Sequence, residues 1–363
     1  MKVVLFLMLA SLTYGQSDFL LLLAADHRNL PYGFEFFLTS ANKFFICSDG
    51  DTLYVNQNIP TYAWTEVTDS ATTTTRDGSE AIYFSGKHWL FGGWNVSTAS
   101  HNEIWNSTDA VTWDSIGTAA WQDAHTFFVC QIGDTLFKMG ADIQTPDSTT
   151  YKSTDGITWA EISSDNGLDS LVLMGFILSP NKDTVFAYGG QRGLVGQTPD
   201  TTIVEDSIFI SLNNGRTFTS VDTPPWTGGN MWEAVIYYDN RYWKVGGGAY
   251  TVGHQRAVYN STDGISWTLV GNVPFTPSQY HQLEVFDNRL WVIGGYHYEA
   301  PSGDQNRVFY TTGGKAWIEV ETTPWEIRHA LSGWIAGSSL YTFGGTGAGN
   351  TGYKDVQKLT RTN

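Results

Sequence analysis

A glycine doublet that closes a short aromatic strand returns along this chain at nearly constant spacing. The motif occurs six times, and successive copies lie 48 to 57 residues apart. Five copies carry Gly-Gly, whereas the second carries Gly-Ala. The first glycines of the six motifs are Gly92, Gly140, Gly189, Gly246, Gly294 and Gly344. A period of this length is typical of a repeat architecture, in which each unit packs only on its neighbours.

A second motif, a polar turn followed by an aromatic residue, alternates with the first. Its clearest copies are Ser-Thr-Asp-Gly-Ile-Thr-Trp159 and Ser-Thr-Asp-Gly-Ile-Ser-Trp267. Each unit therefore contains an apolar strand, a tight turn, the aromatic Gly-Gly strand, a third strand, the polar turn and a fourth strand. Four strands in roughly 40 to 50 residues predict one blade of a β-propeller.

We predict an all-β, seven-bladed propeller that forms a single domain over 16–363. Trp64 lies 49 residues before Trp113, which indicates a shortened first blade near the N-terminus. The last blade has three strands, so we expect the apolar segment 19–25 to pair with the strand near 353–360, because such closure removes free sheet edges. The predicted blades span about 34–68, 80–117, 125–163, 173–222, 232–271, 281–321 and 329–360.

On these motifs the chain resembles Kelch-type propellers of the galactose oxidase central-domain kind, with turns like the Asp-boxes of sialidase propellers. Residues 211–218 fit the Asp-box pattern directly, and the other turns are one residue shorter. Galactose oxidase would imply copper held by Tyr and His, with one Tyr cross-linked to Cys. However, we place Cys47 and Cys130 on strands, where two buried free thiols are favoured and a disulfide between them stays open, and no Cys/His spacing indicates zinc. We therefore expect neither a metal nor a cofactor.

The N-terminus and the charge predict an exported protein. Residues 1–15 contain a lysine, an apolar run and small residues at Thr13 and Gly15, which is typical of a signal peptide. We therefore expect a secreted, periplasmic or cell-surface location. No later stretch has the length and apolar character of a membrane span. The formal net charge of −16 argues against a nucleic-acid partner.

Functional residues are expected on the face that carries the loops between second and third strands and the links between blades, here called the loop face. The opposite face, here called the turn face, carries tight turns whose polar side chains we interpret as turn-formers. Arg76 and Arg328 each lie 16 residues before their glycine doublet, and His125 and His329 lie 15 before theirs. With Arg28, the two arginines introduce consecutive predicted blades. They suit either a carboxylate ligand or a bracing role between blades, and the sequence leaves both open.

Aromatic residues near the loop face suggest a sugar, because flat rings stack against sugar faces. Trp121, Trp226 and Trp325 recur at matching sites, however, and a recurring tryptophan indicates packing between blades. The candidate ligand-binding residues are Arg28, Arg76, Trp94, His125, Arg192, Trp232, His281, Tyr296, Tyr298, Arg328 and His329.

The favoured interpretation is an exported propeller that binds a glycan or another acidic extracellular ligand on its loop face, without chemistry of its own. One alternative is a carbohydrate-active enzyme that resembles Kelch-type sialic acid mutarotases, a sugar mutarotase or epimerase. Candidates for proton exchange in that alternative are Glu233, His281 and Glu326. The other alternative is a surface adhesion or assembly module that contacts a protein. These alternatives stay open because a fold does not fix a function.

Overall fold

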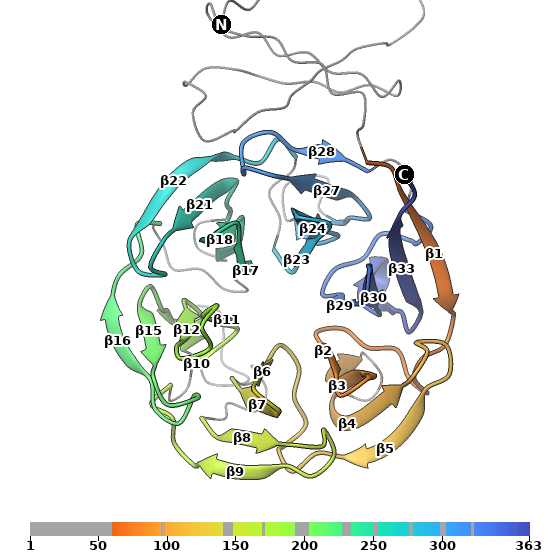
Figure 1. Cartoon of the computed structure of the whole chain (residues 1–363), viewed down its shortest axis with the longest axis horizontal. Helices are drawn as coiled ribbons and strands as arrows, with labels where there is room; N and C mark the ends of the chain where they lie inside the picture. The colour runs from red at the N-terminus through yellow and green to blue at the C-terminus, as the bar shows by residue number, and fades with distance from the viewer. Residues whose placement is uncertain are drawn as a thin grey trace, which may run out of the picture.

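The part of the chain that the structure describes forms a ring of six four-stranded β-sheets around a common axis, with smaller sheets beside them (Figure 1). The computed structural model describes residues 60–95, 97, 99–140, 148–168, 171–192, 203–226, 234–249, 253–275, 279–297, 303–320 and 323–363. Each of the six sheets has four antiparallel strands. Among the described residues, helix is confined to a single 3₁₀ turn at Ala348–Asn350. The predicted all-β propeller is therefore confirmed.

The blades are numbered 1 to 6 in chain order, and each has its first strand beside the axis. The innermost strands of blades 1 to 6 are β2 (Glu80–Phe84), β6 (Phe128–Ile132), β11 (Gly175–Leu178), β17 (Ala234–Tyr238), β23 (Gln282–Phe286) and β29 (Ser332–Ala336). The second strands are β3 (Lys87–Asn95), β7 (Thr135–Met139), β12 (Val185–Tyr188), β18 (Arg241–Val245), β24 (Arg289–Ile293) and β30 (Ser339–Phe343). The third strands are β4 (Ala99–Ser107), β8 (Thr150–Ser153), β15 (Ile208–Ser211), β21 (Ala257–Ser261), β27 (Val308–Thr311) and β33 (Val356–Arg361). The outermost strands are β5 (Asp114–Thr118), β9 (Ala160–Ser163), β16 (Thr219–Asp222), β22 (Trp267–Asn272), β28 (Ile318–Glu319) and β1 (Tyr62–Thr68).

Short strand pairs extend the blades into the loops between second and third strands. They are β13 (Gln191–Arg192) with β14 (Ile203–Val204), β19 (Gly248–Ala249) with β20 (Gly253–His254), β25 (Tyr296–His297) with β26 (Gly303–Asp304), and β31 (Thr346–Gly347) with β32 (Thr351–Gly352). A third strand, β10 (Leu171–Val172), joins the first of these pairs from the link before blade 3.

The predicted number of seven blades is wrong, because the strand around Trp64 does not belong to a blade of its own. It forms β1, which pairs with β33 as the outermost strand of blade 6, with Trp64 opposite Leu359. Trp267 has the equivalent place in blade 4, because it lies opposite Ser261 of β21, the residue that corresponds to Leu359 of β33. Since blades are arranged in a circle, a fourth strand that precedes blade 1 in the sequence can complete blade 6. The closing strand predicted at 19–25 and the signal peptide predicted at 1–15 lie outside the described residues.

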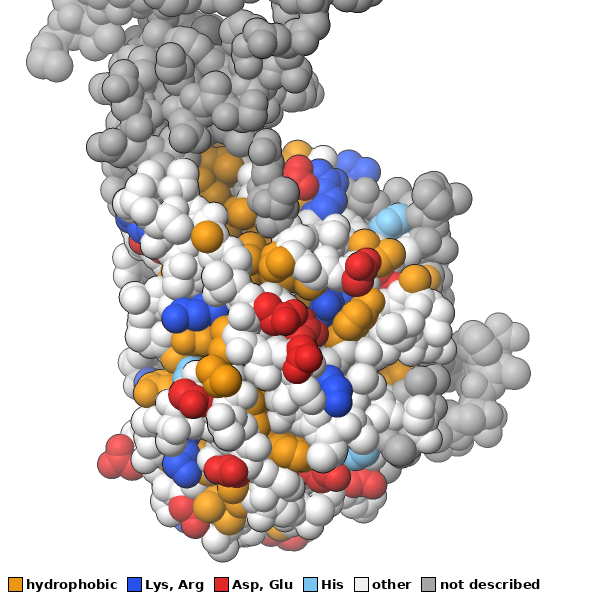
Figure 2. Space-filling view, turned by 90° about the vertical axis from the view of Figure 1, so that its right-hand side faces the viewer, with side chains coloured by type: hydrophobic (Ala, Val, Ile, Leu, Met, Phe, Trp, Pro, Cys, Tyr) orange, Lys and Arg blue, Asp and Glu red, His pale blue; other side chains and the backbone are white. Residues whose placement is uncertain are grey.

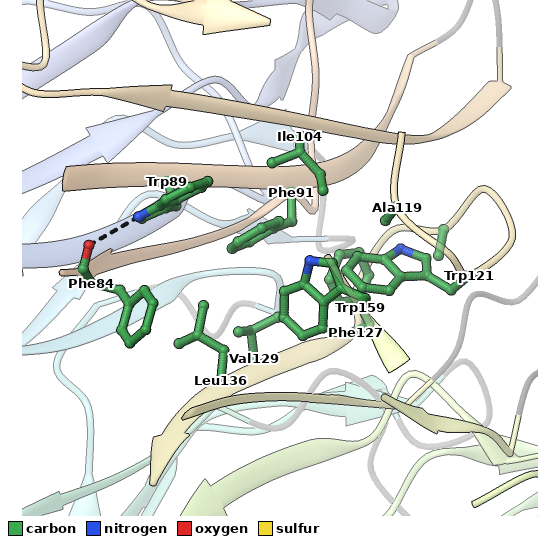
Figure 3. Packing of buried hydrophobic residues seen from close by; sticks show 11 residues of the cluster. Phe84, Trp89, Phe91, Ile104, Ala119, Trp121, Phe127, Val129, Leu136 and Trp159 are labelled. Carbon is green, nitrogen blue, oxygen red and sulfur yellow. Dashed lines mark hydrogen bonds between the residues drawn. The ribbon is translucent and has the colours of Figure 1, made fainter. Parts of the chain in front are cut away.

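The core lies between neighbouring blades and is built largely from aromatic rings. Figure 3 shows this packing between blades 1 and 2, where Trp89 Nε1 donates to the carbonyl of Phe84 at 3.0 Å and Phe91 is fully buried. In the same cluster, the rings of Trp121 and Trp159 meet edge to face with centroids 4.7 Å apart. Burial of aromatic side chains of this size supplies the main driving force for the assembly of the propeller.

The other two recurring tryptophans pack in the same way. Trp226 lies 5.4 Å from Trp267, and Trp325 lies 4.3 Å from Trp64, measured between ring centroids. Each link tryptophan therefore contacts the tryptophan at the outer strand of the blade that it introduces. Their predicted role in packing between blades is confirmed.

Side chains on the turn face hold the polar turns together. Asp263 Oδ1 accepts the backbone N–H groups of Ile265 and Ser266 at 2.8 and 2.7 Å, and Ser261 Oγ donates to the same oxygen at 2.8 Å. Burial raises the pKa of Asp263, but these hydrogen bonds outweigh it and lower the pKa to about 2. Gly264, at φ +78°, lies so close to the ring of Phe186 that a Cβ would approach within 2.8 Å. These turn residues therefore serve structure, as their turn chemistry predicts.

Candidate functional site

Hydrogen bonds between main-chain groups connect neighbouring blades around the axis at the loop face. Four of the links enter their innermost strands through a residue of positive φ, namely Tyr280 (+56°), Ala330 (+53°), Gly78 (+54°) and Thr126 (+58°). The N–H of Ala330 donates to the carbonyl of Tyr280 at 2.9 Å, that of Gly78 to Ala330 at 2.8 Å, and that of Thr126 to Gly78 at 2.7 Å. These bonds form a belt from blade 5 through blades 6 and 1 to blade 2. The belt gives the channel mouth a rim that does not depend on side chains.

A channel with a volume of about 540 Å³ follows the axis between the innermost strands. All six blades contribute to its lining, mostly with aliphatic and aromatic side chains. Against this apolar background, two carboxyl groups stand out. They belong to Glu80 at the start of β2 and to Glu284 in the middle of β23.

Both carboxyl groups have raised pKa values. Burial raises the pKa of Glu80 to about 8, a hydrogen bond from the backbone of Val129 opposes the rise, and the charge of Glu284 adds to it. Burial raises the pKa of Glu284 to about 7, although Gln282 Nε2 donates to its Oε1 at 2.9 Å. Glu284 fits against blade 6 because residue 333 is glycine, where a Cβ would lie 2.6 Å from Oε1. Burial thus moves the pKa values of both carboxyl groups toward neutral pH, the range in which a carboxyl group suits proton transfer.

A cluster of aromatic and polar side chains lies on the rim between blades 5 and 6. His329 Nδ1 lies 2.5 Å from Asp304 Oδ1. The His329 ring lies between Tyr280 and Tyr296, with centroid distances of 5.1 and 5.5 Å. All three rings are half-buried, so each keeps part of its surface open to the solvent. We call Tyr280, Tyr296, Asp304 and His329 the rim cluster.

An equivalent but sparser arrangement lies between blades 1 and 2. His125 Nδ1 lies 3.3 Å from Ser100 Oγ, and its ring centroid lies 6.5 Å from that of Trp94. Ser100 precedes His125 by 25 residues, as Asp304 precedes His329. The equal offsets seen in the sequence therefore correspond to equivalent places, and the structure brings Trp94 together with His125 and Tyr296 together with His329.

Of the two roles that the sequence left open for Arg76 and Arg328, the structure favours bracing. Arg328 is 3% exposed, and its Nη1 bonds to Asp355 Oδ1 at 2.6 Å and to the carbonyl of Gly344 at 3.0 Å. Arg76 is 1% exposed, pairs with Glu103 and donates from Nη1 to the carbonyl of Gly92 at 3.0 Å. Both guanidinium groups are thus occupied inside the protein, so we do not propose them as ligand-binding groups.

The other candidates have diverse surroundings. His281 lines the channel but is 7% exposed, and its Nε2 bonds to the carbonyl of Val245 at 3.1 Å. Glu326 is exposed and lines a second cavity, separate from the channel. Arg192 belongs to β13, but its side chain is not described.

Cys130 is a buried free thiol, and burial raises its pKa to about 12. Arg28, Cys47, Trp232, Glu233 and Tyr298 lie outside the described residues.

The sequence reasoning missed Glu80, Glu284, Tyr280 and Asp304. A signal existed for Glu284, because its equivalents on the inner strands of the other blades are apolar, whereas Glu80 has the polar equivalents Gln282 and Ser332. Within the described ranges, no group of three or more His, Cys, Asp or Glu residues is arranged to hold a metal ion. A search of the same residues found no helix with the length and hydropathy of a membrane span.

Comparison with known proteins supports the fold. No family model matches the chain, and no curated protein matches it either. Among solved structures, the protein is similar to YjhT, with a TM-score of 0.64 at 12% sequence identity. The match covers 82% of this chain and 100% of the YjhT chain. At this identity the likeness establishes a β-propeller and nothing about its ligand.

Proposed function

We propose that the protein is an exported propeller that binds a glycan at the channel mouth on its loop face. The observation that carries the proposal is the rim cluster beside the open channel. Tyr280, Tyr296 and His329 offer partly open rings of the kind that stack on the apolar faces of a sugar. Asp304 and His329 supply acceptor and donor groups that fix the orientation of hydroxyl groups.

The charge distribution favours a neutral glycan over the acidic ligand that the sequence suggested. Arg76 and Arg328 are occupied by their own carboxylate partners. The rim cluster contributes a carboxylate, and the whole chain has a formal charge of −16. An anionic sugar would therefore meet net repulsion at this face.

A glycan array with residues 16–363, followed by NMR titration of each hit, tests this proposal. Tyr296→Ala and His329→Ala should each weaken binding at least tenfold, because each removes a ring or a polar contact of the rim cluster. Leu212→Ser is the matched control, since Leu212 is 71% exposed on the turn face. A protein that binds no carbohydrate, or whose binding survives both rim substitutions, would refute the proposal and favour the protein-contact alternative.

A mutarotase-type activity is the second candidate, and the pair Glu80 and Glu284 favours it. Exchange of sugar anomers requires removal of a proton from the anomeric hydroxyl and delivery of a proton to the ring oxygen. Groups with pKa values of about 8 and 7 suit both steps at neutral pH.

Exchange spectroscopy on the anomers of a bound sugar would test this activity. Glu284→Gln should reduce the exchange rate by at least a hundredfold while sugar binding persists. If the wild-type protein binds sugar without accelerating exchange, the activity is refuted and the binding function stands.

A further inference from the structure

Two buried lysines mark a repeated position between the blades. Lys138 in blade 2 and Lys244 in blade 4 each stand two residues before the glycine doublet and are fully buried. The Nζ atom of Lys244 lies 4.8 Å from the ring centroid of Trp226 and 5.8 Å from that of Tyr259. The Nζ atom of Lys138 lies 5.8 Å from the centroid of its own link tryptophan, Trp121. In both blades an ammonium group therefore occupies an aromatic cage.

Blade 6 keeps the tryptophan of this position but not the lysine or the third-strand ring. Trp325 corresponds to Trp226, whereas Thr342 replaces the lysine and Gln357 replaces the tyrosine on the neighbouring strand. Thr342 and Gln357 are 0% and 2% exposed. Among the described residues, Thr342 Oγ1 and Gln357 Oε1 have no hydrogen-bond partner. Buried oxygens without a partner are costly, so this break in the repeat calls for a ligand.

A cavity of about 360 Å³ lies beside Gln357, lined by the end of β1, the link that contains Trp325 and the loop that precedes β33. Its inner part is lined by the buried side chains of Trp325, Arg328, Asp355 and Gln357. Exposed acidic side chains line its entrance, namely Glu66, Asp69 and Glu326. Figure 2 shows this side of the ring, where Asp and Glu side chains gather near the middle with Lys and Arg beside them.

The hydrogen bonds of the cavity leave the Gln357 Oε1 acceptor and the Trp325 Nε1 donor without partners among the described residues. Gln357 Nε2 donates to Asp355 Oδ2 at 2.7 Å and approaches Glu66 Oε2 at 3.3 Å, which fixes the amide so that Oε1 is the unused atom. Asp355 is also paired with Arg328 at 2.6 Å. The lining carries four carboxylates against the cations Arg328 and Lys354, so its formal charge is negative. The negative lining and the unused Gln357 oxygen together favour an occupant that donates a hydrogen bond and carries positive charge.

We propose that this cavity binds a small organic ammonium ion, whose charged group takes the place that the ammonium groups of Lys138 and Lys244 take in blades 2 and 4. The Trp325 ring and the Gln357 carbonyl oxygen contact the ammonium, and the entrance carboxylates attract it. A cavity of 360 Å³ leaves room for a carbon chain behind the charge. This site is independent of the channel mouth and of the glycan proposal.

A titration of the protein with butylammonium tests the proposal. Binding is measured by calorimetry and by the change in the indole N–H signal of Trp325 in NMR spectra. Trp325→Phe assigns that signal. Butanol, which has the same shape without the charge, should not bind, and tetramethylammonium, which cannot donate, should bind at least tenfold more weakly than butylammonium.

The substitution Thr342→Lys is the most decisive test, because the new lysine supplies an internal ammonium group in place of the bound one. It should abolish butylammonium binding and raise the melting temperature. Glu66→Gln should weaken binding severalfold, whereas Glu161→Gln, the same register position in blade 2, should not change it. Binding that persists in Thr342→Lys, or no binding of butylammonium beyond that of sodium at equal ionic strength, would overturn the proposal and leave ordered water as the occupant.

Discussion

Arg328→Met should lower the free energy of unfolding by about 3–5 kcal/mol, because it breaks a buried ion pair from one side. The Arg328 side chain is 4% exposed, and Asp355 is 11% exposed. The guanidinium group also stacks on Tyr353 at 3.7 Å from the ring centroid. Methionine keeps much of the apolar stem but leaves the Asp355 carboxylate charged and buried without its cation. For a chain of 363 residues, the loss corresponds to a melting temperature roughly 4–7 °C lower.

Arg76→Met is the matched control for this prediction. Its carboxylate partner, Glu103, is 34% exposed, so water can solvate the charge that remains. Ser79 Oγ also donates to the carbonyl of Gly92, which therefore keeps a partner when Arg76 is removed. We expect a loss of about 1–2 kcal/mol for Arg76→Met, smaller than that for Arg328→Met.

Thermal unfolding followed by circular dichroism measures both losses. Adding Asp355→Asn to Arg328→Met should recover most of the stability, because no unpaired charge is then buried. If Arg328→Met melts within about 2 °C of the wild type, or if Arg76→Met is the more damaging change, the bracing argument is refuted.

Three further substitutions test other parts of the fold. Because burial raises the pKa of Glu80 from its usual 4.5 to about 8, the folded protein holds a proton that the unfolded chain releases, so stability should fall between about pH 4.5 and pH 8. Melting temperatures from pH 4 to 9 should show a flatter profile for Glu80→Gln, and an identical slope would contradict the burial of this carboxyl group. The carboxylate of Asp263 stabilises the fold above its usual pKa of 3.8, and this contribution is lost as the pH falls through about 2. Asp263→Ala should therefore cost about 1 kcal/mol at pH 7 in urea unfolding, since the exposed carboxylate is screened, and an equal cost at pH 2 would count against this origin. Trp64→Ala should cost about 3 kcal/mol by the same method, because it removes the ring that packs on Trp325, and a neutral effect would show that β1 adds little to blade 6.

The strand content could be predicted from the sequence because glycine doublets and polar turns report local geometry. The blade number could not be predicted in the same way. The 49-residue interval from Trp64 to Trp113 is the same whether Trp64 ends a blade of its own or completes the last blade of a ring. Only the partner strand decides, and β33 lies almost 300 residues away from Trp64.

The candidate site was predicted in part for a related reason. Equal offsets correctly assigned Arg76 and Arg328 to equivalent positions in two blades, and likewise His125 and His329. An offset does not tell, however, whether a side chain points into solvent or between blades. A further regularity would have helped, because Glu103 and Asp355 each follow their arginine by 27 residues. An acid at the same offset from each arginine indicates an internal partner. The burial of the two channel carboxyl groups, those of Glu80 and Glu284, could be recognised only after the inner strands of the six blades had been assembled around the axis.

The belt of main-chain hydrogen bonds around the channel mouth bears on how such a protein can diversify. Residues as different as Tyr280, Ala330, Gly78 and Thr126 occupy it, since its bonds use only N–H and carbonyl groups. The side chains above it are therefore free to change without loosening the ring, apart from the small cost of holding a positive φ. Integrity and specificity are thus encoded by separate atoms of the same residues, which makes the mouth a region where new ligands can be acquired by substitution while the scaffold is conserved.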